Sequence, residues 1–146
     1  MGLDAHCNDI FIKCGSYSSM EKIREQLLFS LKDYLECDSE CTVANKDELI
    51  DILVDSLSSH ATIGYENLNQ SEYKKPFWRH GLDGFFPFLE IEDQGCLSPY
   101  EAERFLDTFE KVKEYAHHSL KDCDEEFVYQ SIFEESINSQ ENITFS

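Results

Sequence analysis

The segment from Glu90 to Glu101 has the spacing of a twelve-residue calcium-binding loop. Gly95 stands at position six, where such a loop turns sharply, and Glu101 stands at position twelve, where a carboxylate chelates the ion. Positions one, three and five carry longer side chains than the usual Asp or Asn, and these would crowd a tight loop. We therefore favour an acidic turn without a metal, with calcium binding as the alternative. The candidate calcium ligands are Glu90, Glu92, Gln94, Ser98 and Glu101.

A second candidate site is a row of carboxylates that follows Asn45. Asp47, Asp51 and Asp55 are spaced by four residues, which places them on one face of a helix. Such a row destabilises a helix slightly, so it is either tolerated at an exposed surface or kept for a basic partner. We expect a partner to bind here, because groups fixed on a helix lose little entropy on binding. The predicted binding residues are Asp38, Glu40, Asp47, Glu48, Asp51 and Asp55, and an alternative set is Glu125, Glu126, Glu134 and Glu135.

Catalytic motifs and thiol chemistry give weaker signals. The sequence has no glycine-rich phosphate loop, nucleophile elbow or H-E-x-x-H helix, so we expect neither an enzyme nor a cofactor. Cys37 and Cys41 are the only close pair among six cysteines, and no second pair follows at zinc-site spacing. Residues 1–15 lack a basic stretch followed by a long apolar one, so we expect a cytoplasmic protein with reduced thiols.

The charge of the chain bears on its partners. Its 146 residues include 30 acids and only 12 Lys and Arg, which gives a formal net charge of −18. A field of this sign repels nucleic acids and anionic membranes, and it attracts basic proteins. Since 41% of the residues are hydrophobic and 13% are aromatic, the chain can still bury a core. Its length predicts one domain over residues 1–146.

Helical patterns dominate the elements that must position these groups. Ser98 and Glu101 form a capping-box pattern with Pro99 at the first helical position, which predicts a helix from Pro99 to about His118. Apolar spacing predicts further helices at residues 19–37, after Asn45, and from Asp124 onward. We therefore predict a mainly α fold, a bundle of about four principal helices.

Other stretches are expected to contribute less. Residues 9–14 are short and β-prone, which predicts a small strand near the N-terminus. Phe77 and Trp78 are expected to anchor a turn-rich region in the core. The apolar run Gly84–Leu89 is either a short buried helix or an extended core segment. The polar tail at residues 138–146 is expected to fray.

Taken together, these features resemble the immunity proteins of bacterial polymorphic toxins, such as those of contact-dependent growth inhibition. The segments that carry most of the resemblance are residues 14–24, CGSYSSMEKIR, and Gly84–Ala102. The resemblance implies tight binding to a cognate toxin, often a basic nuclease. From the negative charge we expect no direct contact with nucleic acid or membrane. A calcium-binding regulatory module of the EF-hand type and an enzyme that uses carboxylates remain the alternatives.

Overall fold

The chain begins with a β-hairpin. A computed structural model describes residues 2–37, 43–58, 68–91 and 94–146. Strand β1 (Gly2–Cys7) pairs antiparallel with β2 (Ile10–Ser16) across a turn in which Asn8 has a φ of 55°. Asn tolerates this left-handed conformation better than most residues, and it suits a tight hairpin turn. The strand predicted at residues 9–14 is confirmed by β2, which begins one residue later and extends to Ser16, but its partner β1 was not predicted.

The hairpin is part of a four-stranded antiparallel sheet with the order β2-β1-β4-β3. Strand β3 (Gly95–Leu97) pairs with β4 (Ile143–Phe145), and β4 also pairs with β1. The expectation of a mainly α bundle is therefore wrong, and the fold is mixed α/β. The missed strands β3 and β4 have three residues each, too few to show an alternating pattern in the sequence.

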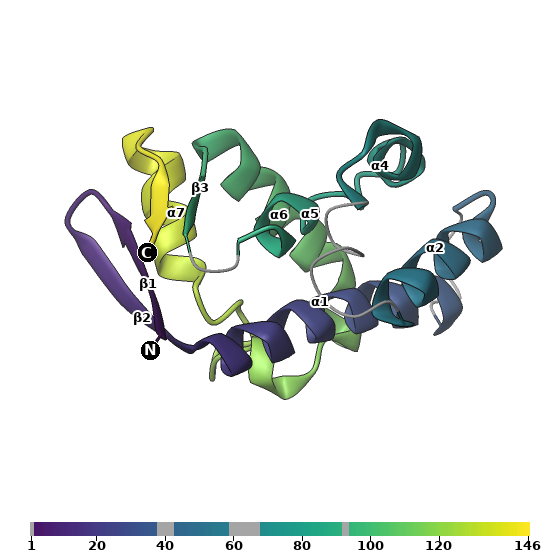
Figure 1. Ribbon diagram of the computed structural model, residues 1–146, viewed down its shortest axis with the longest axis horizontal. Helices are drawn as coiled ribbons and strands as arrows, with labels where there is room; N and C mark the ends of the chain where they lie inside the picture. Colours follow the sequence, from purple (N-terminus) through teal and green to yellow (C-terminus); the bar gives the residue numbers. More distant parts are fainter. Residues whose placement is uncertain (1, 38–42, 59–67, 92–93) are drawn as a thin grey trace.

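Helices form most of the remaining structure (Figure 1). In the part of the chain that the structure describes, every helix is too short or too polar to cross a membrane. The α-helices are α1 (Tyr17–Cys37), α2 (Lys46–Ser58), α4 (Ser71–Trp78), α5 (Phe86–Leu89), α6 (Pro99–Val112) and α7 (Gln130–Ser139), and two short 3-10 helices are η1 (Lys113–Tyr115) and η2 (His118–Leu120).

Two helix boundaries differ from the prediction. Helix α6 begins at the predicted Pro99, but it ends at Val112 and continues only as 3-10 turns. The last helix begins at Gln130 rather than near Asp124, because the Asp122 carboxylate accepts hydrogen bonds from the backbone of Asp124 and Glu126. These bonds hold the acidic stretch in a turn, as Asp side chains commonly do.

A cluster of phenylalanines joins the helices to the sheet. The Phe88 ring of α5 lies 5.5 Å from the Phe105 ring of α6 and 6.0 Å from the Phe145 ring of β4. Phe127 and Phe133 close the same cluster, and all five side chains are buried. Gly84–Leu89 is thus a buried segment whose residues from Phe86 onward form α5, one of the two structures considered for it.

Residues 138–139 end helix α7 and Ile143–Phe145 form strand β4, so the expectation that residues 138–146 fray is wrong. Ile143 and Phe145 are buried, and β4 lies between β1 and β3. Asp4 and Ser146 exchange two backbone hydrogen bonds of 2.9 and 3.0 Å. The tail reads as polar because only alternate residues of so short a strand face the core.

Long helix α1 spans the molecule between two groups of elements (Figure 1). The sheet and α7 lie at one end, and α2 lies at the other end next to α4. The N-terminal end of α1 follows directly from β2, so the hairpin and this helix form one continuous support. Helix α2, which carries the predicted carboxylates, therefore lies away from the sheet.

Candidate functional site

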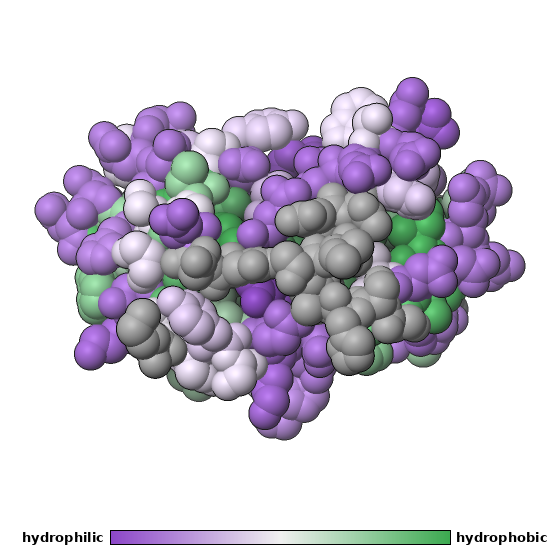
Figure 2. Space-filling view, in the orientation of Figure 1, coloured by the Kyte–Doolittle hydropathy of each residue, from purple (hydrophilic) through white to green (hydrophobic). Residues whose placement is uncertain are grey.

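The predicted carboxylates on α2 form an exposed surface, which we term the α2 acidic face and define as Asp47, Glu48, Asp51 and Asp55. All four side chains are exposed, whereas the opposite side of the helix buries Leu49 and Leu53. Figure 2 shows hydrophilic side chains at the end of the molecule where α2 lies, beside a smaller apolar area. The other two predicted residues of this site, Asp38 and Glu40, lie outside the described residues.

Helix α2 is held in place by packing against its neighbours and by the backbone hydrogen bonds of its first turn. Contacts of α2 with α1 and α4 hold it from two sides. The Asn45 carbonyl accepts the first backbone bonds, from Glu48 at 3.1 Å and from Leu49 at 3.3 Å. Asp47 and Glu48 lie in the first turn, where the helix dipole favours negative charge. Val54 is 39% exposed and follows Asp51 by three residues, so this face also offers an apolar contact.

The alternative acidic set does not form one helical face. Glu125 lies in the turn before α7 and pairs with Lys121 at 2.9 Å, while Glu126 is exposed in the same turn. Glu134 and Glu135 lie on α7, where they accept hydrogen bonds from Gln130 and Asn8. Three of the four carboxylates therefore already form an ion pair or a hydrogen bond within the protein.

The loop with calcium-binding spacing contains strand β3 and the capping residues of helix α6. Gly95 begins strand β3, and Glu101 accepts a 2.9 Å hydrogen bond from the Ser98 backbone, while the Ser98 side chain accepts one of 3.1 Å from the Glu101 backbone. The predicted capping box is thereby confirmed. Of the other candidate calcium ligands, Glu90 and Gln94 are exposed and Glu92 lies outside the described residues. Within the ranges that the structure describes, no three His, Cys, Asp or Glu side chains are grouped as a metal site would require.

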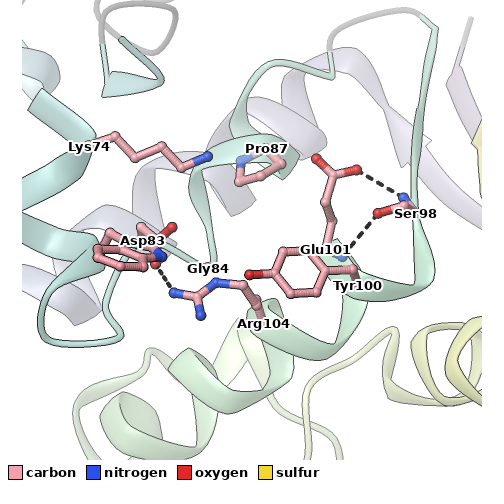
Figure 3. A pocket seen from close by; sticks show the side chains of 9 residues that line it. Lys74, Asp83, Gly84, Pro87, Ser98, Tyr100, Glu101 and Arg104 are labelled. Atoms are coloured by element: carbon pink, nitrogen blue, oxygen red, sulfur yellow. Dashed lines mark hydrogen bonds and ion pairs between the residues drawn. The ribbon is translucent and has the colours of Figure 1, made fainter. Parts of the chain in front are cut away.

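A hollow of about 450 Å³ lies between α4 and the first turns of α6, and we term it the α4–α6 pocket (Figure 3). Trp78 borders it and is 54% exposed, so the expectation that Trp78 is a core anchor is wrong; Phe77 is the buried anchor. The two residues are adjacent on a helix and point about 100° apart, so only one can face the core. The pocket is lined by Lys74, Trp78, Asp83, Gly84, Pro87, Ser98, Tyr100, Glu101 and Arg104.

An ion pair fixes one wall of this pocket. Arg104 binds the carboxylate of Asp83, whose side chain is only 4% exposed. Next to it, the Gly84 backbone donates a 3.1 Å hydrogen bond to Thr108, and a Cβ at Gly84 would overlap the carbonyl oxygen of Arg104. Helix α6 therefore packs directly on the chain at Asp83–Gly84, which only glycine permits. The sequence gives one signal for this site, the basic aromatic run Tyr73–His80.

The thiols divide into buried and exposed groups. Cys7 and Cys14 are buried, whereas Cys37, Cys96 and Cys123 are exposed, and all five are free. Burial raises the pKa of both buried thiols, that of Cys14 to about 11. A raised pKa suppresses the reactive thiolate, so these two residues suit packing rather than catalysis.

Comparison with known protein families, with characterised proteins and with solved structures finds no match. The function must therefore be argued from the surfaces and the pocket themselves.

Proposed function

We propose that this protein is an immunity protein, a cytoplasmic inhibitor that binds a basic nuclease toxin through the α2 acidic face. The observation that carries this proposal is a set of four exposed carboxylates on one packed helix, in a chain with a net charge of −18. The free thiols are compatible with the reducing cytoplasm.

The charge of the α2 acidic face matches the chemistry of such a partner. A nuclease holds phosphates with Lys and Arg, so its active-site surface is cationic. Carboxylates can take the place of those phosphates, and Arg binds a carboxylate with two parallel hydrogen bonds. Opposite fields also steer the encounter, which raises association rates by about 10-fold to 1,000-fold.

The structure favours the α2 acidic face over the C-terminal carboxylates. Asp47, Glu48 and Asp51 are exposed on a helix that already packs against α1 and α4. Their carboxylates can therefore meet a partner with little loss of backbone entropy. Val54 adds an apolar contact on the same face, and affinity needs such a contact because charges at the rim contribute little.

The test requires the cognate toxin, which we expect to be encoded beside this gene as the C-terminal part of a large secreted protein. The toxin is purified with this protein, and association rates are measured at low and high salt. Asp47, Asp51 and Asp55 are then replaced together by Lys. Three reversals of two charges each change the net charge from −18 to −12, and we expect association to slow at least about tenfold at low salt.

A matched control separates this face from general charge. Glu103, Asp107 and Glu110 are exposed at nearly the same helical spacing on α6, and their reversal changes the net charge equally. The only described ion pair that this control removes is the exposed one between Glu110 and Lys113, which contributes little stability. If the α2 variant protects cells and binds at the wild-type rate while circular dichroism shows intact helices, the proposed interface is wrong. If no basic toxin binds the wild-type protein at all, the function is wrong as well.

A further inference from the structure

We propose that the α4–α6 pocket binds an aromatic carboxylate, either a free acid or the C-terminal residue of a polypeptide. This inference is independent of toxin binding, since it concerns a different surface and a ligand of opposite charge. It rests on cations that can accept one more anion, on exposed aromatic rings, and on a rigid wall.

The cations of the pocket favour a single negative charge. Lys74 reaches from α4 toward Pro87 across the pocket (Figure 3), and it has no ion pair among the described residues. Arg104 uses one terminal nitrogen to bind Asp83, and a guanidinium has five N–H donors, so donors remain for a second acceptor. Asp83 is thus already neutralised by Arg104.

The carboxylate of Glu101 also lines the pocket, and one of its oxygens faces the start of α6 (Figure 3). It accepts the hydrogen bond from the Ser98 backbone that completes the capping box (Figure 3). With Arg104 paired to Asp83, the cation of this site that has no ion pair among the described residues is the Lys74 ammonium. A monoanion such as a carboxylate balances it, whereas a multiply charged phosphate meets the repulsion of a chain with a net charge of −18.

The exposed aromatic side chains of the pocket favour a ligand that carries an aromatic ring. Trp78 is 54% exposed and Tyr100 is 63% exposed, although large aromatic side chains are normally mostly buried. The Arg104 guanidinium lies 6.0 Å from the centre of the Tyr100 ring, which places cation and ring together at the pocket. A ligand ring can bury apolar area against these side chains, as aromatic pairs commonly do.

Size and rigidity suit a small ligand. The pocket volume of about 450 Å³ falls within the roughly 300–1,000 Å³ of typical ligand sites. The Asp83–Arg104 ion pair and the close packing at Gly84 hold its wall in place before a ligand arrives. Preorganisation of this kind reduces the entropy lost on binding.

The test uses phenylacetate as the probe and the fluorescence of Trp78, the only tryptophan of the chain. We expect a saturable change with a Kd of about 1 mM or tighter, which corresponds to about −4 kcal/mol. Phenylacetamide lacks the charge and acetate lacks the ring, so each should bind at least about tenfold more weakly. Saturation-transfer NMR of the phenyl protons measures the same binding without relying on Trp78.

Variants locate the site. Lys74→Gln should weaken phenylacetate binding at least tenfold, and Tyr100→Leu should weaken it severalfold, whereas the matched control Lys22→Gln, on the exposed face of α1, should leave it unchanged. The residues changed are at least partly exposed, so circular dichroism should show the wild-type fold.

A tripeptide that ends in phenylalanine distinguishes the two sources of the ligand. Tighter binding of this peptide than of phenylacetate, lost when its C-terminus is amidated, indicates a polypeptide end, and the reverse order indicates a free acid. The proposal is overturned if neither probe saturates by about 10 mM, if phenylacetamide binds as well as phenylacetate, or if Lys74→Gln binds like the wild type.

Discussion

Strand β4 offers the sharpest test of the structure, because its residues read as a polar tail in the sequence. Phe145→Ala removes a ring that is 1% exposed and lies 6.0 Å from the Phe88 ring. If the tail were frayed, this change would have no effect on stability. If β4 is the inner strand between β1 and β3, the change opens a cavity where the sheet meets the aromatic core.

The expected magnitude follows from the burial of Phe145. Replacing a fully buried Phe by Ala typically lowers the free energy of unfolding by about 3–5 kcal/mol, since the lost transfer energy and the cavity both count. Domains are stable by only about 5–15 kcal/mol in total. We therefore expect Phe145→Ala to lose at least about a fifth of the stability of the wild-type protein.

Urea unfolding followed by circular dichroism measures the change. With a slope of about 1–3 kcal/mol per molar urea, the midpoint should fall by at least about 1 M. The control is Thr144→Ala in the same strand. Because the Thr144 side chain is exposed, this change should lower the free energy of unfolding by less than about 1 kcal/mol. Equal midpoints for the two variants would refute the placement of β4 in the sheet.

Two further predictions concern the capping box and the buried thiol. Ser98→Ala should lower the free energy of unfolding by about 1 kcal/mol, because the Glu101 backbone N–H loses its acceptor. Ser98→Asp should restore most of this free energy, since Asp is also a good N-cap residue. Equal thermal unfolding of Ser98→Ala and the wild type would contradict this prediction. Burial raises the pKa of Cys14 to about 11 from 9.0, and it also raises the pKa of Tyr129, so the fold favours their neutral forms. The stability that the neutral Cys14 thiol contributes is complete below about pH 9 and is lost as the pH rises to about 11, whereas the loss from Tyr129 begins only near its ordinary pKa of 10.0. Urea midpoints should therefore fall between pH 9 and 11, less steeply in Tyr129→Phe, and a flat profile would contradict the assignment.

The sequence anticipated the features that local chemistry controls. Helix α1 follows from its apolar spacing, and it spans residues 17–37 against a prediction of 19–37. The capping box forms as expected, since its two hydrogen bonds join residues only three positions apart. The α2 acidic face was visible for the same reason, because a spacing of four residues places Asp47 and Asp51 on one side of any helix.

The pocket could be anticipated only in part. The run Tyr73–His80 shows that cations and aromatics lie close together, but it does not show which ring faces outward. Trp78 is exposed because Phe77 fills the core position, where its ring lies 5.0 Å from that of Phe86. Arg104 joins this site only through the fold, from a position 26 residues further along the chain than Trp78.

What the sequence alone determined is therefore local: helix starts, helical faces and the overall charge. The tertiary structure alone decided the sheet, because β4 pairs with β1 across nearly the whole length of the chain and no local pattern specifies such a partner. The start of the last helix is a local feature that the apolar spacing missed, since the Asp122 carboxylate holds the acidic residues before α7 in a turn. Hydrogen bonds between distant backbone segments become favourable only when the aromatic core has brought those segments together, and a short strand gains its stability from that core rather than from its own residues.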